Sequence, residues 1–90
     1  MRFNGALVQL EDMVIAVAVD SADFLSLPQP EKMAKMRAYQ SAFPKTPFVM
    51  LLDMGAGESE FFGRPDLVAK MREVPLNYIT FKVYLQKQIL

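Results

Sequence analysis

The sequence predicts a small α/β domain of the α+β type, a two-layer sandwich in which helices pack on a mixed sheet. Two continuous apolar runs, residues 13–19 and 48–52, have the composition of central strands that are covered on both faces. Between them, residues 30–43 repeat apolar side chains every three or four positions, which predicts a helix. Strand, helix and strand with short connections form a βαβ unit with parallel strands and a right-handed crossover. We expect this unit at the centre of a ββαββα order that ends in one further strand.

The composition indicates one domain spanning residues 1–90 and excludes much of the chemistry that side chains perform near neutral pH. The chain contains no histidine and no cysteine, which excludes imidazole bases, thiolate nucleophiles, disulfides and Cys/His zinc sites. Hydrophobic residues make up 52% of the chain, which is enough for a core with apolar surface left for a partner. Ten basic and ten acidic side chains balance, so we expect no attraction to nucleic acid or to an acidic membrane.

The first twenty residues predict a β-hairpin. Residues 2–10 are compatible with a strand, and Glu11 and Asp12 separate them from the apolar run 13–19. Two residues between two apolar runs are typical of a tight hairpin turn.

The first helix has recognisable ends. Pro30 lies at its first turn, where a missing backbone N–H costs nothing, and Pro44 stops it. Glu31 is four residues before Lys35, a spacing that favours an ion pair on the helix surface. The predicted apolar stripe of the helix consists of Met33, Met36, Tyr39, Gln40 and Phe43.

After the strand at 48–52, the glycine-rich stretch 54–59 predicts a turn into a short antiparallel strand at 60–62. A second helix then opens at Arg64-Pro65-Asp66, again with proline in the first turn, and Pro75 ends it. Its predicted inner stripe consists of Leu67, Val68, Met71 and Val74.

The last fifteen residues predict a half-exposed edge strand. Apolar side chains alternate there with more polar ones, which is the period of a strand. A helix over residues 78–90 is the alternative, and the β-branched and aromatic content favours the strand. The apolar set of this strand is Ile79, Phe81, Val83 and Leu85.

Two aspartates are candidate metal ligands. Asp20 and Asp53 each follow one of the buried runs, and parallel neighbours would place both at the same carboxyl edge of the sheet. With Asp23 nearby in sequence, they could ligate a hard cation such as Mg²⁺. The competing interpretation, which we favour, is that strand-end aspartates cap the following turn and stay solvated.

A candidate anion site lies at the start of the second helix, where Gly63, Arg64 and Asp66 flank the proline. Free N–H groups and the Arg64 guanidinium could bind a phosphate, with the glycine turn at residues 55–57 near the same ligand. Asp66 would compete for these donors, and no phosphate-binding fingerprint is present. A structural role for these residues is the favoured interpretation.

Phe61 and Phe62 are adjacent in a predicted strand, so their side chains point to opposite faces of the sheet. One of them then needs cover from a helix or from a partner. With Phe81, Val83 and Leu85 of the last strand, they are the candidate interface residues.

The basic residues of the first helix and of the turn after it have a simpler interpretation. A solvated helix surface accounts for them better than a nucleic-acid contact does. No motif places a base beside a serine or threonine, so we expect no catalytic residue. The basic residues are Lys32, Lys35, Arg37 and Lys45.

The layout from Met13 to Val74, with Thr46-Pro47 just before the strand at 48–52, is similar to the C-terminal half of thioredoxin-like domains. The likeness is one of layout alone, because the Cys-x-x-Cys motif of that family is missing and the chain is too short for its N-terminal half. No functional residue follows from it.

These observations favour a non-catalytic interaction or assembly module that forms a homodimer. Its expected partner is a second copy of the chain or else another protein. The alternative is a domain that binds a divalent cation or a phosphate at the carboxyl edge of the sheet, and that could be a hydrolase. We expect no cofactor. Glu11 and Asp12 interrupt any signal-peptide pattern and no apolar run approaches the ~20 residues of a membrane span, so the cytoplasm is the expected location.

Overall fold

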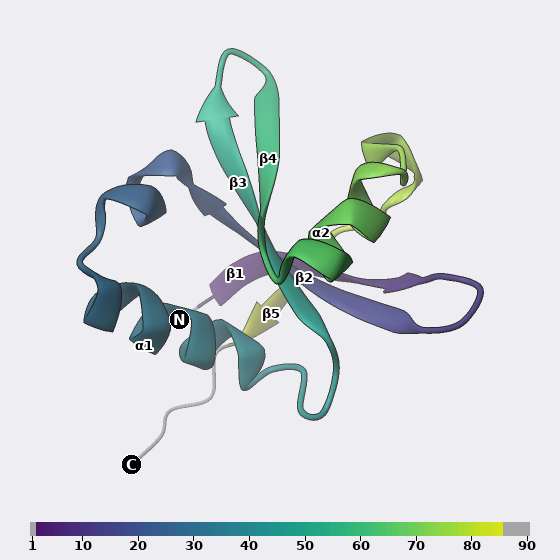
Figure 1. Cartoon of the computed structure of the whole chain (residues 1–90), viewed down its shortest axis with the longest axis horizontal. Coiled ribbons are helices and arrows are strands. Elements are labelled where there is room, and N and C mark those ends of the chain that lie inside the picture. Colours follow the sequence, from purple (N-terminus) through teal and green to yellow (C-terminus); the bar gives the residue numbers. More distant parts are fainter. Residues whose placement is uncertain (1, 86–90) are drawn as a thin grey trace.

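The computed structural model describes residues 2–85, in which a five-stranded mixed sheet carries two α-helices (Figure 1). The strands lie in the order β4-β3-β2-β1-β5. In chain order the elements are β1 (Arg2–Gln9), β2 (Val14–Ser21), the 3₁₀ turn η1 (Ala22–Ser26), α1 (Gln29–Gln40), β3 (Phe48–Gly55), β4 (Glu58–Gly63), α2 (Pro65–Arg72), the 3₁₀ turn η2 (Leu76–Tyr78) and β5 (Lys82–Leu85). This confirms the predicted α+β class, its mixed sheet and its ββαββα order with a final strand.

The pairing of the strands confirms the predicted units. β1 and β2 form an antiparallel hairpin, in which the backbone N–H of Leu10 donates to the carbonyl of Met13 over 2.8 Å. β2 and β3 are parallel, as the βαβ unit requires, and β4 returns antiparallel to β3. Of the predicted final strand, Lys82–Leu85 forms β5 and pairs antiparallel with β1, whereas Leu76–Tyr78 forms the turn η2 and residues 79–81 belong to no strand. The predicted part beyond Leu85 lies outside the described residues.

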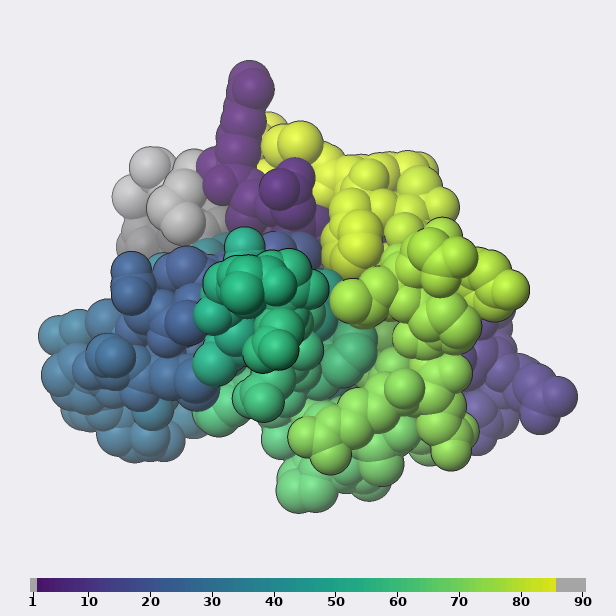
Figure 2. Space-filling model, turned by 90° about the horizontal axis from the view of Figure 1, so that it is seen from above, coloured from purple at the N-terminus to yellow at the C-terminus, as the bar shows by residue number. Residues whose placement is uncertain are grey.

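The two helices cover opposite faces of the sheet. Each helix forms a separate helix-on-sheet core with the face that it covers. Figure 2 shows α1 in blue and the segment with α2 in green on either side of the β3–β4 hairpin. Because successive side chains of a strand point to opposite faces, the strands contribute residues to both cores. The face under α2 buries Ala6, Val8, Ile15, Val17, Val49, Leu51, Leu67, Val68, Met71 and Ile79. The face under α1 buries Phe3, Ala16, Ala18, Phe24, Tyr39, Phe43, Phe48, Met50 and Leu52.

Only part of the predicted α1 stripe is core. Tyr39 is buried and Met36 packs against the cluster, but Met33 at the start of the helix is 42% exposed. The contacts of α1 with the sheet are aromatic and lie near its C-terminal end, where the rings of Tyr39 and Phe3 approach edge to face at 4.9 Å between centroids. The predicted ion pair of Lys35 with a residue of its own helix is replaced by one with Asp20 on β2.

β5 packs on the core through Tyr84, which lies on the face of the strand that the sequence pattern assigned to solvent. The ring of Tyr84 lies 4.8 Å from that of Phe43 and belongs to the core under α1. Val83 and Leu85, on the other face of the strand, are 63% and 66% exposed. The apolar alternation therefore identified a strand correctly, while an aromatic side chain anchors it.

Candidate functional site

Asp20 is held at the end of β2 by two side chains of α1. Its Oδ2 accepts a hydrogen bond from the Tyr39 hydroxyl over 2.8 Å and lies 2.8 Å from the Lys35 ammonium nitrogen. Its Oδ1 accepts from the backbone N–H of Ser21 over 2.7 Å. Burial alone raises the pKa of Asp20, but the hydrogen bonds from Lys35, Tyr39 and Ser21 together outweigh it and lower that pKa. Burial, with the neighbouring Asp20 carboxylate, raises the pKa of Tyr39 well above its ordinary value.

The sequence offered one signal for this cluster, and our sequence reasoning missed it. Lys35 and Tyr39 are four residues apart, so they lie on the same face of a helix. That both reach Asp20 follows only from the position of α1 on the sheet. The cluster joins β2 to α1, and its carboxylate oxygens are occupied by donors of the protein itself.

The structure does not bring Asp20 and Asp53 together, as the alternative interpretation of a metal site would require. In the parallel register Asp20 lies opposite Leu52, and Asp53 lies opposite Ser21. Residues that are one position out of step point to opposite faces of a sheet, so the two carboxylates diverge. Asp53 instead accepts a hydrogen bond from the N–H of Gly55 over 2.9 Å, which caps the β3–β4 turn. Within residues 2–85 no three acidic side chains gather in a metal-binding group.

Arg64 and Asp66 are paired with each other at the start of α2. Arg64 donates to Asp66 through both Nε, over 3.0 Å, and a terminal nitrogen, over 2.6 Å. This bidentate pair occupies the guanidinium fork that an anion would need. Gly63 has a φ of 151° and packs against Val49, and so redirects the chain as expected.

The glycine turn at residues 55–57 does not approach this helix start. It lies at one end of β4, and Gly63 lies at the other end. The prediction that both segments could contact one ligand is therefore wrong.

Phe61 and Phe62 are half-buried and packed within the protein, as their adjacent positions require. Phe61 packs on the cluster under α2, and Phe62 on the cluster under α1. The ring of Phe62 lies 5.4 Å from that of Phe24, edge to face. Cover for both rings thus comes from the fold, and they do not join the exposed apolar side chains of β5.

The other three candidate interface residues do form an exposed surface. Phe81 lines an open groove of about 410 Å³ together with Leu76 and Asn4. Asn4 pairs in register with Val83, so Val83 adjoins the groove on the same face. We call Leu76, Phe81, Val83 and Leu85 the β5 patch; their exposed fractions are 43%, 38%, 63% and 66%. Sequence reasoning missed Leu76, which opens the turn η2 directly after Pro75.

The β5 patch is open because α2 packs at the opposite end of its face of the sheet. Because α2 lies over β3 and β4, the end of this face at β1 and β5 receives only the short segment around η2.

Comparison with known proteins identifies no counterpart. No protein-family model matches the chain, and no curated protein or solved structure matches it. The likeness in layout to thioredoxin-like domains gains no support from these comparisons. In residues 2–85, no helix is both long enough and apolar enough to cross a bilayer.

Proposed function

We propose that this chain is a non-catalytic interaction or assembly module of the cytoplasm, which forms a homodimer through the β5 patch. The observation that carries the proposal is the clustering of four large apolar side chains beside an open groove on one face of the sheet. Contiguous exposed apolar surface of this kind is characteristic of protein interfaces. In a two-fold dimer the same patch of both copies is buried, so a self-complementary apolar surface suffices.

The polar groups of the molecule support the same choice over ligand chemistry. The Asp20 carboxylate is held by Lys35 and Tyr39, and the Arg64 guanidinium by Asp66. Groups already satisfied within the fold gain little from a cation or an anion, because each new contact replaces an existing one. The unsatisfied surface on the face of α2 is apolar, which suits a protein partner.

Light scattering behind size exclusion tests the proposal over a range of protein concentrations. The natural chain should run at twice the mass of one chain, and the dimer should persist in EDTA and in Mg²⁺. The double variant Val83→Lys and Leu85→Lys should be monomeric, because burying two ammonium groups in an apolar interface costs several kcal/mol per ion. Leu7→Lys is the matched control: Leu7 is also exposed, at 55%, but lies on the other face of the sheet.

The outcomes separate the two functions. A natural chain that stays monomeric at every concentration contradicts the dimer. A dimer that Leu7→Lys dissociates as readily as the double variant does would contradict the β5 patch as its interface. A dimer that forms only with Mg²⁺ would instead favour the cation-binding alternative.

A further inference from the structure

The strand β1 has a second neighbour for only half of its length. β5 pairs with Arg2–Gly5, and within residues 2–85 no strand pairs with that edge beyond Gly5. The N–H of Leu10 points towards the hairpin partner Met13. Because peptide groups alternate in direction along a strand, the N–H and C=O of Leu7 and Gln9 point the opposite way, to the open edge. Two donors and two acceptors therefore line this part of β1, spaced as a further strand requires.

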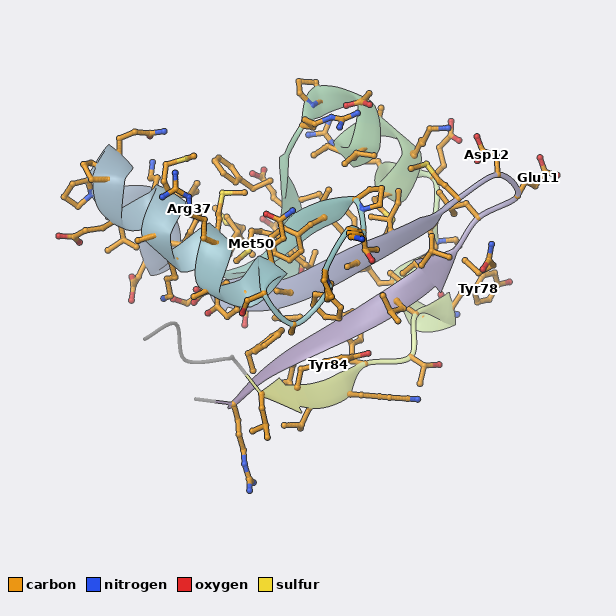
Figure 3. The ribbon with its side chains drawn as sticks, turned by 90° about the horizontal axis from the view of Figure 1, so that it is seen from below. Glu11, Asp12, Arg37, Met50, Tyr78 and Tyr84 are labelled. Carbon is orange, nitrogen blue, oxygen red and sulfur yellow. The ribbon has the colours of Figure 1, made fainter. Side chains whose placement is uncertain are left out.

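A groove of about 480 Å³ runs along this edge. One wall is β1 from Leu7 to Leu10, and the other is the segment from Glu73 to Thr80 that leads from α2 towards β5. Leu7 and Tyr78 are exposed at 55% and 77%, so both offer apolar surface to an occupant. Figure 3 shows Tyr78 on the same end of the molecule as the hairpin tip with Glu11 and Asp12.

The one charged side chain among the described residues lining the groove is acidic. Glu73 lines it, and Glu11 and Asp12 extend from the adjoining hairpin tip. Lys70 lies 3.7 Å from Asp12 and balances one of these three carboxylates. The remaining negative charge favours an occupant with a basic side chain. It disfavours a second copy of β1, which would bring the same acids to the groove.

We propose that the open edge of β1 binds an extended segment of another protein by strand addition. The segment pairs with the backbone of Leu7 and Gln9, places an apolar side chain against Leu7 and Tyr78, and carries a lysine or arginine towards Glu73. Strand addition of this kind combines main-chain hydrogen bonds with pockets for alternate side chains. The surface is distinct from the β5 patch, so this inference does not depend on the proposed dimer.

The first test uses a blocked synthetic peptide, Lys-Val-Thr-Val-Thr-Lys, and its acidic twin Glu-Val-Thr-Val-Thr-Glu, titrated into the ¹⁵N-labelled chain. The amides of Leu7 and Gln9 should shift, and their hydrogen exchange should slow on addition of the basic peptide. The acidic twin should bind at least about tenfold more weakly, a difference of about 1.4 kcal/mol. Equal binding of the two peptides, or unchanged exchange at both amides, would overturn the proposal.

A matched pair of variants tests the backbone contact. Gln9→Pro removes an outward-facing donor without removing a β1–β2 hydrogen bond, and an edge position of this kind tolerates proline. Gln9→Ala keeps the donor. The proline variant should bind the basic peptide at least about tenfold more weakly, and the alanine variant as the natural chain does. Equal affinity in both variants would contradict strand addition.

Two further measurements keep the result interpretable. If Gln9→Pro does not fold, Glu73→Lys replaces it and should reduce the preference for the basic peptide over its twin. The monomeric variant Val83→Lys with Leu85→Lys should still bind the basic peptide. Shifts centred on Val83 and Leu85 in the natural chain would place the peptide on the β5 patch and overturn the assignment. Slow exchange at Leu7 and Gln9 without peptide, lost on dilution, would identify a second copy as the occupant and overturn it as well.

Discussion

At the residue scale, Asp20 shows how contacts within the protein give a candidate metal ligand a structural role. Its side chain is only 12% exposed, and two donors of α1 meet its Oδ2. Removing a carboxylate from water is unfavourable unless hydrogen bonds replace those it loses. Lys35 and Tyr39 supply them, so Asp20 joins a strand to a helix.

The Asp20–Tyr39 hydrogen bond predicts a pH-dependent effect of Tyr39→Phe. At pH 7 the variant should lose about 1.5–3 kcal/mol of unfolding free energy, as expected for a hydrogen bond to a charged group. The folded-state pKa of Asp20 lies below the ordinary 3.8, so the stability from its ionised form is present above about pH 4 and lost as the pH falls through that lower pKa. Urea unfolding at pH 7 and in strong acid should show the difference between the two proteins narrowing on acidification. A constant difference would contradict the assignment.

The same hydrogen bond has an alkaline signature. The folded-state pKa of Tyr39 is raised above the ordinary 10.0, so its contribution to stability is present below pH 10 and is lost as the pH rises through the raised value. Ultraviolet titration of the phenols should show one tyrosine that resists ionisation above pH 10, and Tyr39→Phe should remove it. Ionisation of every tyrosine near pH 10 in the natural chain would contradict the burial of Tyr39.

Position 5 requires glycine because a side chain there would collide with neighbouring atoms, and not because its backbone angle is unusual. A Cβ at this position would lie 2.7 Å from the backbone oxygen of Val17 and 3.1 Å from the ring of Tyr84. Because the nearest atom is backbone, Gly5→Ala should destabilise the protein by about 1–3 kcal/mol, the usual cost of overpacking. Leu7→Ala on the same strand is the exposed control and should change stability by less than about 0.5 kcal/mol. Chemical denaturation measures both, and equal stability of the two variants would show that the strands separate at Gly5 at little cost.

At the element scale, the candidate interface residues of β4 pack on the core, whereas those of β5 lie on the surface. Phe61 and Phe62 lie on the edge strand β4 and pack on the two clusters, while Val83 and Leu85 lie exposed on the opposite edge strand β5. Both strands lie at an edge of the sheet, but α2 covers one face of β4 and Phe24 of η1 packs on the other, whereas only the face of β5 that carries Tyr84 is packed. Similar apolar residues therefore have different roles in the two strands.

This difference predicts that truncating Phe62 lowers the unfolding free energy more than truncating Val83 does. Phe62→Ala should cost about 2 kcal/mol, below the roughly 3–5 kcal/mol of a fully buried phenylalanine because its ring is half-buried. Val83→Ala should cost less than about 0.5 kcal/mol, since Val83 is exposed. Denaturation should be measured at a concentration where the chain is monomeric. A larger loss for Val83→Ala would mean that β5 is buried even in the monomer.

At the scale of the whole molecule, two short helices cover opposite faces of a five-stranded sheet and leave the edge strand β5 partly uncovered. The proposed dimer closes this gap, so folding and association should be linked. The thermal midpoint of the natural chain should rise with protein concentration, because mass action stabilises a folded state that associates. The midpoint of Val83→Lys with Leu85→Lys should be independent of concentration. Scanning calorimetry over a hundredfold concentration range would show this, and a constant midpoint in the natural chain would contradict linked dimerisation.

Local patterns in the sequence determined most of the elements. The apolar runs, the two-residue hairpin and the prolines at the helix starts each rest on physics within a few residues, and the structure confirms them. Both helices end before the prolines that were predicted to stop them, α1 at Gln40 and α2 at Arg72. Without histidine or cysteine, the sequence also excluded thiol and imidazole chemistry. Tertiary structure alone decided which side chains meet: a one-residue offset in the β2–β3 register separated Asp20 from Asp53, and the placement of α1 brought Lys35 to Asp20. Register and helix placement depend on the packing of both faces at once, which no local pattern encodes.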